Sequence, residues 1–463
     1  MGAFYSSRRA GKSRLDASLV AIDVVLEFDG LASDAHAKFK SSLEASLRWE
    51  QRLVVCARAR AVVLVRDSAD VRSVAALLWA LVATTARALA PPRSGRAAPP
   101  RRTSVAVRGT LKPYLSTLIG GDGLSFEESR SLFGAFFDGT AAPEEVAAVL
   151  CCLRQKGESF EEVAGAATAM RDACVRVDAP GTLLDIVGTG GDGACTINLS
   201  TCSAILAAAC GAKVTKCGNR SVSSACGAAD VLEALGLDLE LELDDVASCI
   251  EDVGLGFLYA PKNHPAMRFV APVRKALGVR TAFNLLGPLT NAASAQRVVI
   301  GVFDEALVEL LGAALERIGV VDHAVVIHGV GLDELSPLGP CTVKELKRDG
   351  DGYASSTWTL DPLDYGMPRC TLADLVGGGP DFNQRALRRC LAADPASIPL
   401  GEETTLDDAA CRDAIALNAG MGLYVYGAAP DLKAGIALAK DGLASGAGLA
   451  KLDAWIAKTK SYA

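Results

Sequence analysis

A glycine-rich segment between a short apolar run and a helical pattern most limits what this chain can fold into. The apolar run, residues 183–187, is followed at once by Gly188-Thr189-Gly190-Gly191-Asp192-Gly193, and a helix is predicted to begin near Asn198. Glycine adopts left-handed backbone angles, so successive amide groups can converge on an anion, and the start of the next helix attracts the same charge. The segment therefore predicts a phosphate-binding turn at the carboxyl end of a strand.

The same order of elements returns farther along the chain. Short apolar runs followed by glycine and a helical pattern occur at residues 298–302 and 324–327. This alternation is typical of a mostly parallel sheet with crossover helices, so the fold class predicted for residues 179–463 is α/β.

The later part of this domain contains three further predicted elements. Residues 344–352 are charged and rich in glycine, which predicts a surface loop, and Trp358 lies in a predicted edge strand. Helices are expected over residues 406–426 and 431–460.

Residues 109–178 have a different pattern, which predicts a small all-helical domain. Capping boxes begin at Ser125 and Ser159, each followed by apolar residues at helical spacing, and Pro143 opens a helix between them. A later segment, about residues 262–295, is expected to contribute to this domain.

Charge divides the chain near residue 108. Residues 1–108 hold 15 Arg and 3 Lys against 9 acidic residues, a net charge of +9, whereas residues 109–463 hold 29 Lys and Arg against 45 acidic residues, a net charge of -16. An acidic body with only 5% aromatic residues disfavours a nucleic-acid partner, because binding to a phosphate backbone requires Lys and Arg.

The basic segment has the composition of a targeting leader. Its apolar run, residues 74–86, has 13 residues, fewer than the ~20 that a membrane span needs, and residues 91–108 are rich in Pro, Arg, Ala and Ser. We expect residues 1–108 to be a partly disordered leader that delivers the protein to a plastid, with no stable membrane span in the mature protein. The alternatives are a helical layer over residues 15–90, a cytoplasmic protein, or a wrongly joined first exon over residues 1–72.

The 14 cysteines form no metal-binding pattern. No Cys-x-x-Cys pair occurs and the chain holds only 4 His, so a structural zinc site is not expected. Cysteines spread through apolar helical surroundings favour a reducing compartment.

Two common phosphate loops are disfavoured. A dinucleotide-binding fingerprint needs an acid about 20 residues after the loop, where this chain has Lys213, and a Walker loop needs Gly-Lys-Ser/Thr, which is absent. Instead, a second polar segment, residues 216–224, follows the next predicted strand and combines two cations with several hydroxyls. Together with Ser200 and Thr201 at the helix start, it predicts a polyphosphate site.

These segments resemble those of the anthranilate phosphoribosyltransferase family. The resemblance covers about residues 110–463. Its other matching stretches are residues 153–158, 264–267, 271–274, 283–291, His328-Gly329 and Gly331-Leu332-Asp333-Glu334.

The resemblance implies an activity and its partners. The 5-phosphoribosyl group of phosphoribosyl pyrophosphate would pass to the amine of anthranilate, with release of pyrophosphate, as a step of tryptophan biosynthesis. Two Mg²⁺ ions would assist, no side chain would act as nucleophile or general base, and the small helical domain would form a homodimer.

The resemblance also implies the site residues. Anthranilate would contact Gly188, Asn219, Arg274 and His264, and the planar guanidinium of Arg274 suits its carboxylate. The Mg²⁺ ions would be bound by Ser200, Asp333 and Glu334, which are oxygen donors. Phosphoribosyl pyrophosphate would contact Gly188, Thr189, Gly190, Gly191, Asp192, Thr196, Asn198, Leu199, Ser200, Thr201, Lys216, Cys217, Gly218, Asn219, Arg220, Ser221, Val222, Ser223, Ser224 and Ala228.

Simpler roles stay open for several of these residues. Ser200 and Thr201 could cap a helix, Arg274 could be a surface arginine, and His264 could be structural. Asp333 and Glu334 could form a solvated turn.

At the level of the whole chain, the alternatives are a pyrimidine nucleoside phosphorylase-like enzyme and a non-catalytic nucleic-acid-binding relative. The chain ends about 130 residues after Asp333, which argues against the extra C-terminal domain of those phosphorylases.

The chain departs from the family pattern at three places. Cys217 stands where the family has His, and Ala228 stands where a serine is common. Residues 377–380 read Gly-Gly-Gly-Pro in place of Gly-Gly-Asp, at a position expected to lie far from the site.

Overall fold

A computed structural model of the chain describes residues 23–28, 60–65, 111–221, 225–401 and 404–462. The apolar run predicted in the leader, residues 74–86, lies outside the described residues, as do Val222, Ser223 and Ser224. None of the helices in the described part of the chain combines the length and the apolar character that a membrane crossing requires.

The chain divides into two compact units, Met1–Ser104 and Val105–Ala463. In the first unit, β1 (Asp23–Phe28) and β2 (Arg60–Val65) pair in parallel. This pair was not predicted from the sequence.

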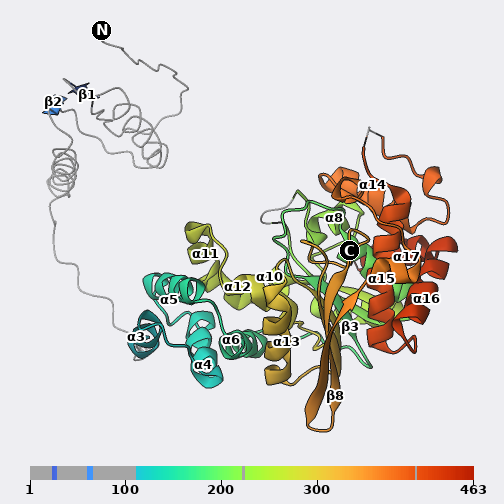
Figure 1. Cartoon of the computed structure of the whole chain (residues 1–463), viewed down its shortest axis with the longest axis horizontal. Helices are drawn as coiled ribbons and strands as arrows, with labels where there is room; N and C mark the ends of the chain where they lie inside the picture. The colour runs from blue at the N-terminus through green and yellow to red at the C-terminus, as the bar shows by residue number, and fades with distance from the viewer. Residues whose placement is uncertain (1–22, 29–59, 66–110, 222–224, 402–403, 463) are drawn as a thin grey trace. The chain divides into compact units, whose positions relative to one another are not determined.

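A helical bundle opens the second unit (Figure 1). Its helices are α3 (Lys112–Ile119), α4 (Phe126–Phe137), α5 (Pro143–Lys156) and α6 (Phe160–Asp172). Both capping boxes are confirmed, because the Ser125 and Ser159 hydroxyls accept the backbone N–H groups of Glu128 and Glu162. Pro143 is the first residue of α5, as predicted.

Later segments return to this bundle. The short helices α11 (Ala271–Leu277) and α12 (Phe283–Leu286) pack against α5 and α6, respectively. Two short helices that follow the edge strand β5 in the chain therefore pack on the helical layer.

The α/β part is built on a seven-stranded sheet of order β5-β4-β3-β6-β7-β8-β9. The first five strands in this order are parallel, and β8 and β9 are antiparallel. The strands are β3 (Leu184–Gly188), β4 (Val214–Gly218), β5 (Leu255–Tyr259), β6 (Arg297–Gly301), β7 (His323–His328), β8 (Cys341–Asp349) and β9 (Gly352–Leu360). The predicted α/β class with a mostly parallel sheet is confirmed.

Helices cover both faces of this sheet. α7 and α15 pack against β3 from one face, and α13 packs against β7 and against α6 of the bundle; Figure 1 shows α13 and α15 on opposite sides of the strands. The remaining helices lie between or after the strands: α7 (Leu199–Ala209), α8 (Ala228–Ala234), α9 (Leu243–Asp252), α10 (Ala260–Asn263), α13 (Ala306–Ile318), α14 (Pro380–Leu391), α15 (Asp408–Tyr426), α16 (Leu432–Ala444) and α17 (Ala447–Lys460).

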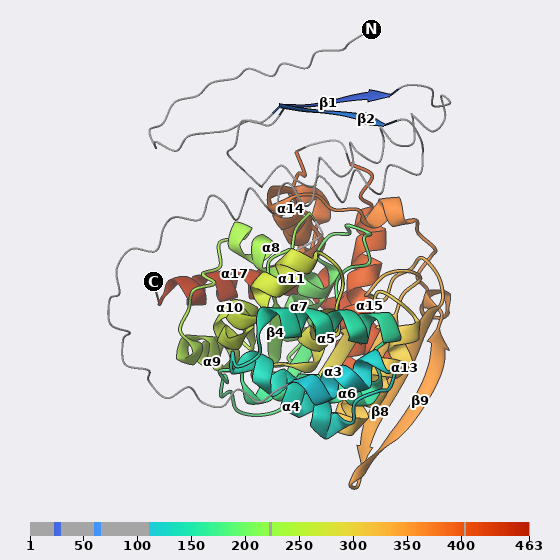
Figure 2. The same cartoon turned by 90° about the vertical axis from the view of Figure 1, so that its left-hand side faces the viewer.

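Two predicted elements were wrong. Residues 344–349, predicted as a loop, belong to β8, which forms a long hairpin with β9 (Figure 2). The charges there are tolerated in a strand because they are paired: Lys344 lies 2.7 Å from Glu309, and Glu345 lies 2.8 Å from His323. β9, which contains Trp358, is the edge strand as predicted.

The helix predicted over residues 431–460 is two helices, α16 and α17. The chain turns between them at Gly446, whose φ of 73° lies in the left-handed region that glycine tolerates.

The order of the strands sets the position of the site. From β3 the chain moves through β4 to β5, and then returns to β6 on the other side of β3. In sheets of this kind, the crevice at the carboxyl ends of the strands where the order reverses is the usual ligand site. Gly188 and Gly301, the last residues of β3 and β6, stand at that point.

Candidate active site

The glycine-rich turn after β3 has the backbone that the sequence predicted. Gly190, Gly191 and Gly193 have φ values of 66°, 86° and 76°, which residues with a side chain rarely adopt. The Thr189 N–H donates to the Gly301 carbonyl over 2.9 Å, so the turn is fixed to β6. The Gly190 N–H donates to the Asp333 carboxylate over 2.6 Å.

Asp333 and Glu334 lie in a loop after β7 that is held at both ends. His328 joins it to the residue after β6: one ring nitrogen lies 2.8 Å from the Val302 carbonyl, and the other accepts the Gly331 N–H over 3.1 Å. At the far end, buried Asn418 of α15 bonds both backbone groups of Leu335, over 3.0 and 2.7 Å. The acid pair is therefore not the solvated turn that was its alternative.

Three glycines leave the space that this loop occupies. A Cβ atom at Gly188 would overlap the Asp333 carboxylate, and one at Gly301 would overlap the Asp333 backbone oxygen. A Cβ at Gly329 would overlap the Glu334 backbone oxygen. Gly301 was missed in the sequence, because a glycine at a strand end has many simpler explanations.

Three carboxylates converge in this crevice. Asp192, Asp333 and Glu334 each offer an oxygen, and these oxygens lie within 4.8 Å of one another. Burial and then the Asp192 charge raise the pKa of Asp333 to about 7, and burial and then Asp333 raise the pKa of Glu334 well above its usual range. One Glu334 carboxylate oxygen is buried without a hydrogen-bond partner. Such a set fits a divalent cation, which supplies both the missing charge and the missing partner.

The role of Asp192 was only partly predicted from the sequence. The sequence placed it among phosphate ligands, whereas the structure brings its carboxylate to the acid pair. Because Asp192 precedes Asp333 by more than a hundred positions, only the pairing of the strands reveals this proximity.

Magnesium binding is expected to weaken as the pH falls. Without a cation, Asp333 takes up a proton near pH 7, and a proton on the carboxylate competes with Mg²⁺. Between about pH 8 and about pH 6, the concentration of Mg²⁺ that half-saturates the protein should rise about tenfold. Titration of MgCl₂ alone, followed by the shift of the thermal midpoint, measures this. Equal half-saturation at both pH values would contradict it.

Lys216, in the middle of β4, is buried against β3 and the start of α7. Its ammonium donates to the Ile186 carbonyl over 2.9 Å and to the Ser200 hydroxyl over 3.3 Å. Burial lowers the pKa of Lys216, although neighbouring acids, Asp185 foremost, oppose this. A buried cation and the start of α7 thus face the same crevice.

Ser200 and Thr201 do not cap α7. The residue before the helix is Asn198, no side chain caps the helix start, and the buried Thr201 hydroxyl has no hydrogen-bond partner. Leu199 is the first residue of α7 and is fully buried.

Asn198 serves the scaffold with its side chain. Its amide donates to the Cys226 carbonyl over 3.0 Å and accepts from Asn383 of α14 over 2.9 Å. Asn383 in turn accepts the Gly378 N–H over 2.7 Å. This chain of contacts was not predicted.

The residues around Gly377 were wrongly expected to lie far from the site. Thr196 pairs with Val376 in an isolated bridge, and the Gly377 N–H donates to the Cys195 carbonyl over 2.9 Å. A Cβ at Gly377 would meet the Thr196 carbonyl at 2.9 Å, so this glycine permits the close approach.

Two of the four residues predicted for anthranilate, His264 and Arg274, lie on the segment after β5, whereas Gly188 ends β3 and Asn219 follows β4. Arg274 of α11 is partly buried, and its guanidinium lies 5.2 Å from the centre of the Phe283 ring. The guanidinium forms no hydrogen bond or ion pair with the described residues. Burial lowers its pKa. A half-buried guanidinium without an anion is suited to receive one.

His264 is buried, with 8% of its surface exposed, and its Nδ1 has no hydrogen-bond partner. Burial is the main reason that its pKa falls to about 4, so the ring is neutral at physiological pH.

The second polar segment continues β4 and leads to α8. Cys217 and Gly218 end β4, and Ala228 is the first residue of α8. The Cys217 N–H donates to buried Asp185 over 3.2 Å, and burial raises the pKa of the Cys217 thiol well above its usual range. Asp185 also accepts from Asn291 over 2.8 Å, a buried contact behind the site that was not predicted.

A helical bundle joined to an α/β domain, with a phosphate-type turn facing a cation site, defines a two-domain group-transfer enzyme. Residues 112–174 match the helical bundle domain of the glycosyl transferase family, and residues 180–449 match its a/b domain.

The similar proteins that have names all carry the same one. The chain is 43% identical over 344 residues to an anthranilate phosphoribosyltransferase of Chelativorans sp., covering 74% of this chain and 96% of that protein. The crystal structure of the enzyme of that name from Thermus thermophilus is 44% identical, with a TM-score of 0.67 over 75% of this chain and 99% of that one. The Saccharomyces cerevisiae enzyme, solved in complex with PRPP and Mg, is 29% identical with a TM-score of 0.67, over 76% and 98% of the two chains. The chain belongs to the anthranilate phosphoribosyltransferase family.

Proposed function

We propose that this protein transfers the 5-phosphoribosyl group of phosphoribosyl pyrophosphate to the amine of anthranilate, giving N-(5-phosphoribosyl)anthranilate and pyrophosphate in tryptophan biosynthesis. The observation that carries the proposal is the glycine-rich turn facing three converged carboxylates. The yeast relative has been solved with PRPP and Mg, and also with 4-fluoroanthranilate, which supports both substrates.

The diphosphate would lie against the turn after β3 and the start of α7. The amide group of Gly191, the Thr201 hydroxyl and the Lys216 ammonium are the donors that would face it. As the bond from the ribose anomeric carbon to the diphosphate oxygen breaks, negative charge builds on the leaving pyrophosphate, and donors already in place stabilise that charge.

Two Mg²⁺ ions, when bound, would neutralise diphosphate charge. Ser200, Asp333 and Glu334 are the proposed ligands. The Asp192 carboxylate lies close enough to Asp333 and Glu334 to bind an ion together with them. The acceptor nitrogen bonds to the anomeric carbon as pyrophosphate leaves, and the nitrogen then loses a proton. No side chain needs to form a covalent intermediate.

Anthranilate would be bound by its carboxylate on Arg274. Gly188, Asn219 and His264 are the proposed neighbours of its ring. We propose further that the mature protein is a plastid homodimer, with residues 109–178 as the dimerising domain and residues 1–108 as the leader.

The function is tested with the purified full chain. Anthranilate fluorescence should fall when phosphoribosyl pyrophosphate and MgCl₂ are added together, and should stay constant when either is omitted. No loss of fluorescence with both present would overturn the proposal. Release of a free base from pyrimidine nucleosides and phosphate, or a gel shift with single-stranded DNA at physiological salt, would favour the two rival functions.

Arg274→Ala is expected to raise the KM for anthranilate about 10- to 100-fold and to change the KM for phosphoribosyl pyrophosphate by less than about threefold, since a charged hydrogen-bond pair contributes about 1.5 to 3 kcal/mol. Steady-state kinetics with each substrate varied in turn measure this. Lys275→Ala, an exposed cation on the same helix, is the matched control. Equal effects on both KM values would count against Arg274 as the carboxylate ligand.

Cys217→His, which restores the residue that the family has at this place, is expected to keep or lower the KM for anthranilate. An imidazole adds a ring donor, and Asp185 beneath it can accept a hydrogen bond as it accepts the backbone N–H now. The same kinetic assay decides; a large loss of activity would show that the cysteine has a role of its own.

A further inference from the structure

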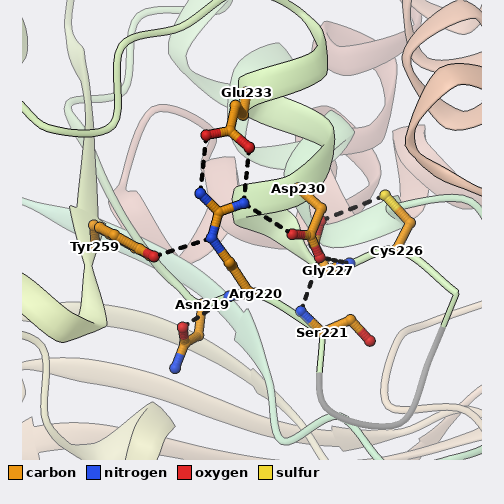
Figure 3. A network of polar contacts seen from close by, with 8 residues as sticks. All are labelled: Asn219, Arg220, Ser221, Cys226, Gly227, Asp230, Glu233 and Tyr259. Atoms are coloured by element: carbon orange, nitrogen blue, oxygen red, sulfur yellow. Dashed lines mark hydrogen bonds and ion pairs between the residues drawn. The ribbon is translucent and has the colours of Figure 1, made fainter. Parts of the chain in front are cut away.

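Arg220 directly follows Asn219 in the second polar segment, where the family resemblance counts it among the diphosphate ligands. In the structure its guanidinium is bound from three sides by protein side chains (Figure 3). It donates to both oxygens of Glu233 over 2.8 and 2.9 Å, to Asp230 over 3.2 Å, and to the Tyr259 hydroxyl over 3.2 Å.

These contacts already compensate the charge of Arg220. Glu233 and Asp230 are one turn apart on α8, and Tyr259 ends β5, so the arginine joins two elements on either side of its own segment. Because the guanidinium is planar and presents several N–H donors in fixed directions, one arginine side chain can bind Glu233, Asp230 and Tyr259 together. A diphosphate would have to displace two carboxylates to reach the same donors.

Asp230 extends the network to the backbone. While one of its oxygens accepts from Arg220, the other accepts the N–H groups of both Ser221 and Gly227 over 2.9 Å each. The two ends of the 221–227 segment are thereby tied to the start of α8. A Cβ at Gly227 would meet the Arg220 backbone at 2.8 Å, so the ends are also closely packed.

Asn219 is held by the same group of contacts. Its side-chain oxygen accepts the Arg220 N–H over 2.8 Å, and its carbonyl accepts the Ala229 N–H over 3.1 Å. The position of Asn219, a proposed neighbour of both substrates, therefore depends on how Arg220 and α8 are joined.

We propose that Arg220 is a positioning residue: held by Glu233, Asp230 and Tyr259, it fixes Asn219 and Ser221 for substrate binding and does not itself bind the diphosphate. This inference rests on the proposed function, because its effect is read in the binding of phosphoribosyl pyrophosphate.

The direction in which one substitution changes the KM for phosphoribosyl pyrophosphate distinguishes a positioning role of Arg220 from direct binding. Glu233→Ala releases the guanidinium. If Arg220 bound the diphosphate directly, its release would strengthen binding, and the KM for phosphoribosyl pyrophosphate would stay equal or fall. If Arg220 positions the segment, that KM should rise about tenfold, as should the inhibition constant of pyrophosphate with MgCl₂.

A second substitution tests the same distinction independently. Arg220→Lys keeps the positive charge but cannot reach Glu233, Asp230 and Tyr259 together. We expect it to raise the KM for phosphoribosyl pyrophosphate as much as Arg220→Met does. A lysine that restores most of the binding lost in the methionine variant would indicate a direct charge contact instead.

The experiment measures both KM values, kcat and the thermal midpoint of the full-length variants, with Glu251→Ala on the exposed face of α9 as control. The proposal requires a raised KM in Glu233→Ala and Arg220→Lys with a thermal midpoint within about 3 °C of the unsubstituted protein. Glu233→Gln, which keeps one acceptor, replaces Glu233→Ala if that variant does not fold. An unchanged or lowered KM, or a change in stability alone, would overturn it; an inactive unsubstituted protein would instead overturn the proposed function.

Discussion

Replacing Glu334 with Gln is expected to reduce kcat/KM at least about 100-fold, because an amide is a far weaker ligand than a carboxylate for a cation among phosphates. The same change should leave the metal-free fold intact or raise its thermal midpoint. Three carboxylates crowd the crevice, and one Glu334 oxygen is buried without a partner, so a neutral side chain relieves repulsion. Activity assays and thermal melts with and without MgCl₂ measure both effects.

The matched control for this change is Glu251→Gln, an exposed carboxylate on α9 that lies outside the carboxylate group. It should leave kcat/KM and the response to MgCl₂ unaltered. A Glu334→Gln protein that MgCl₂ still stabilises as strongly as the unsubstituted protein would show that the cation is bound elsewhere.

Gly301→Ala is the second substitution from which a large effect is expected. The added methyl group would overlap the Asp333 backbone oxygen, and that loop is fixed between His328 and Asn418, so it cannot move away easily. We expect a loss of about 3 kcal/mol in the free energy of unfolding, at the upper end of what overpacking costs, and almost no activity. Denaturant unfolding and the fluorescence assay measure these losses.

Gly134→Ala is its control, since no atom lies within 4 Å of the added methyl group in α4. Alanine at this half-buried helix position should stabilise the protein by about 0.5 to 1 kcal/mol, because it has the higher helix propensity. A Gly301→Ala protein with ordinary activity would show that the loop holding Asp333 can shift, and the crevice would then be less rigid than its contacts imply.

The elements that depend on local chemistry could be predicted from the sequence. The capping boxes at Ser125 and Ser159 and the glycine-rich turn after β3 each follow from residues that are neighbours in the chain. Their signals are local because the hydrogen bonds and backbone angles that they determine are local.

Contacts between distant segments could not be predicted in the same way. The bonds of Asn198 to Asn383, and of Asn418 to Leu335, join residues 185 and 83 positions apart. Asparagine within a helix has no pattern that tells which loop it will meet. The error at β8 has a related cause, because Lys344 and Glu345 read as loop residues until the partners that pair them, Glu309 and His323, are known.

The loop that carries Asp333 and Glu334 is held by Asn418, and this affects the order in which the site can form during synthesis of the chain. The phosphate turn is synthesised early, yet the Asp333 carboxylate that bonds Gly190 comes 143 positions later, and the asparagine that holds Leu335 lies in α15, later still. A nascent chain on the ribosome therefore has a phosphate-type turn long before it can have a finished cation site. Metal binding would therefore indicate that α15 has been synthesised and has packed against the loop. A chain released before α15 would contain the glycine-rich turn but would lack a finished cation site.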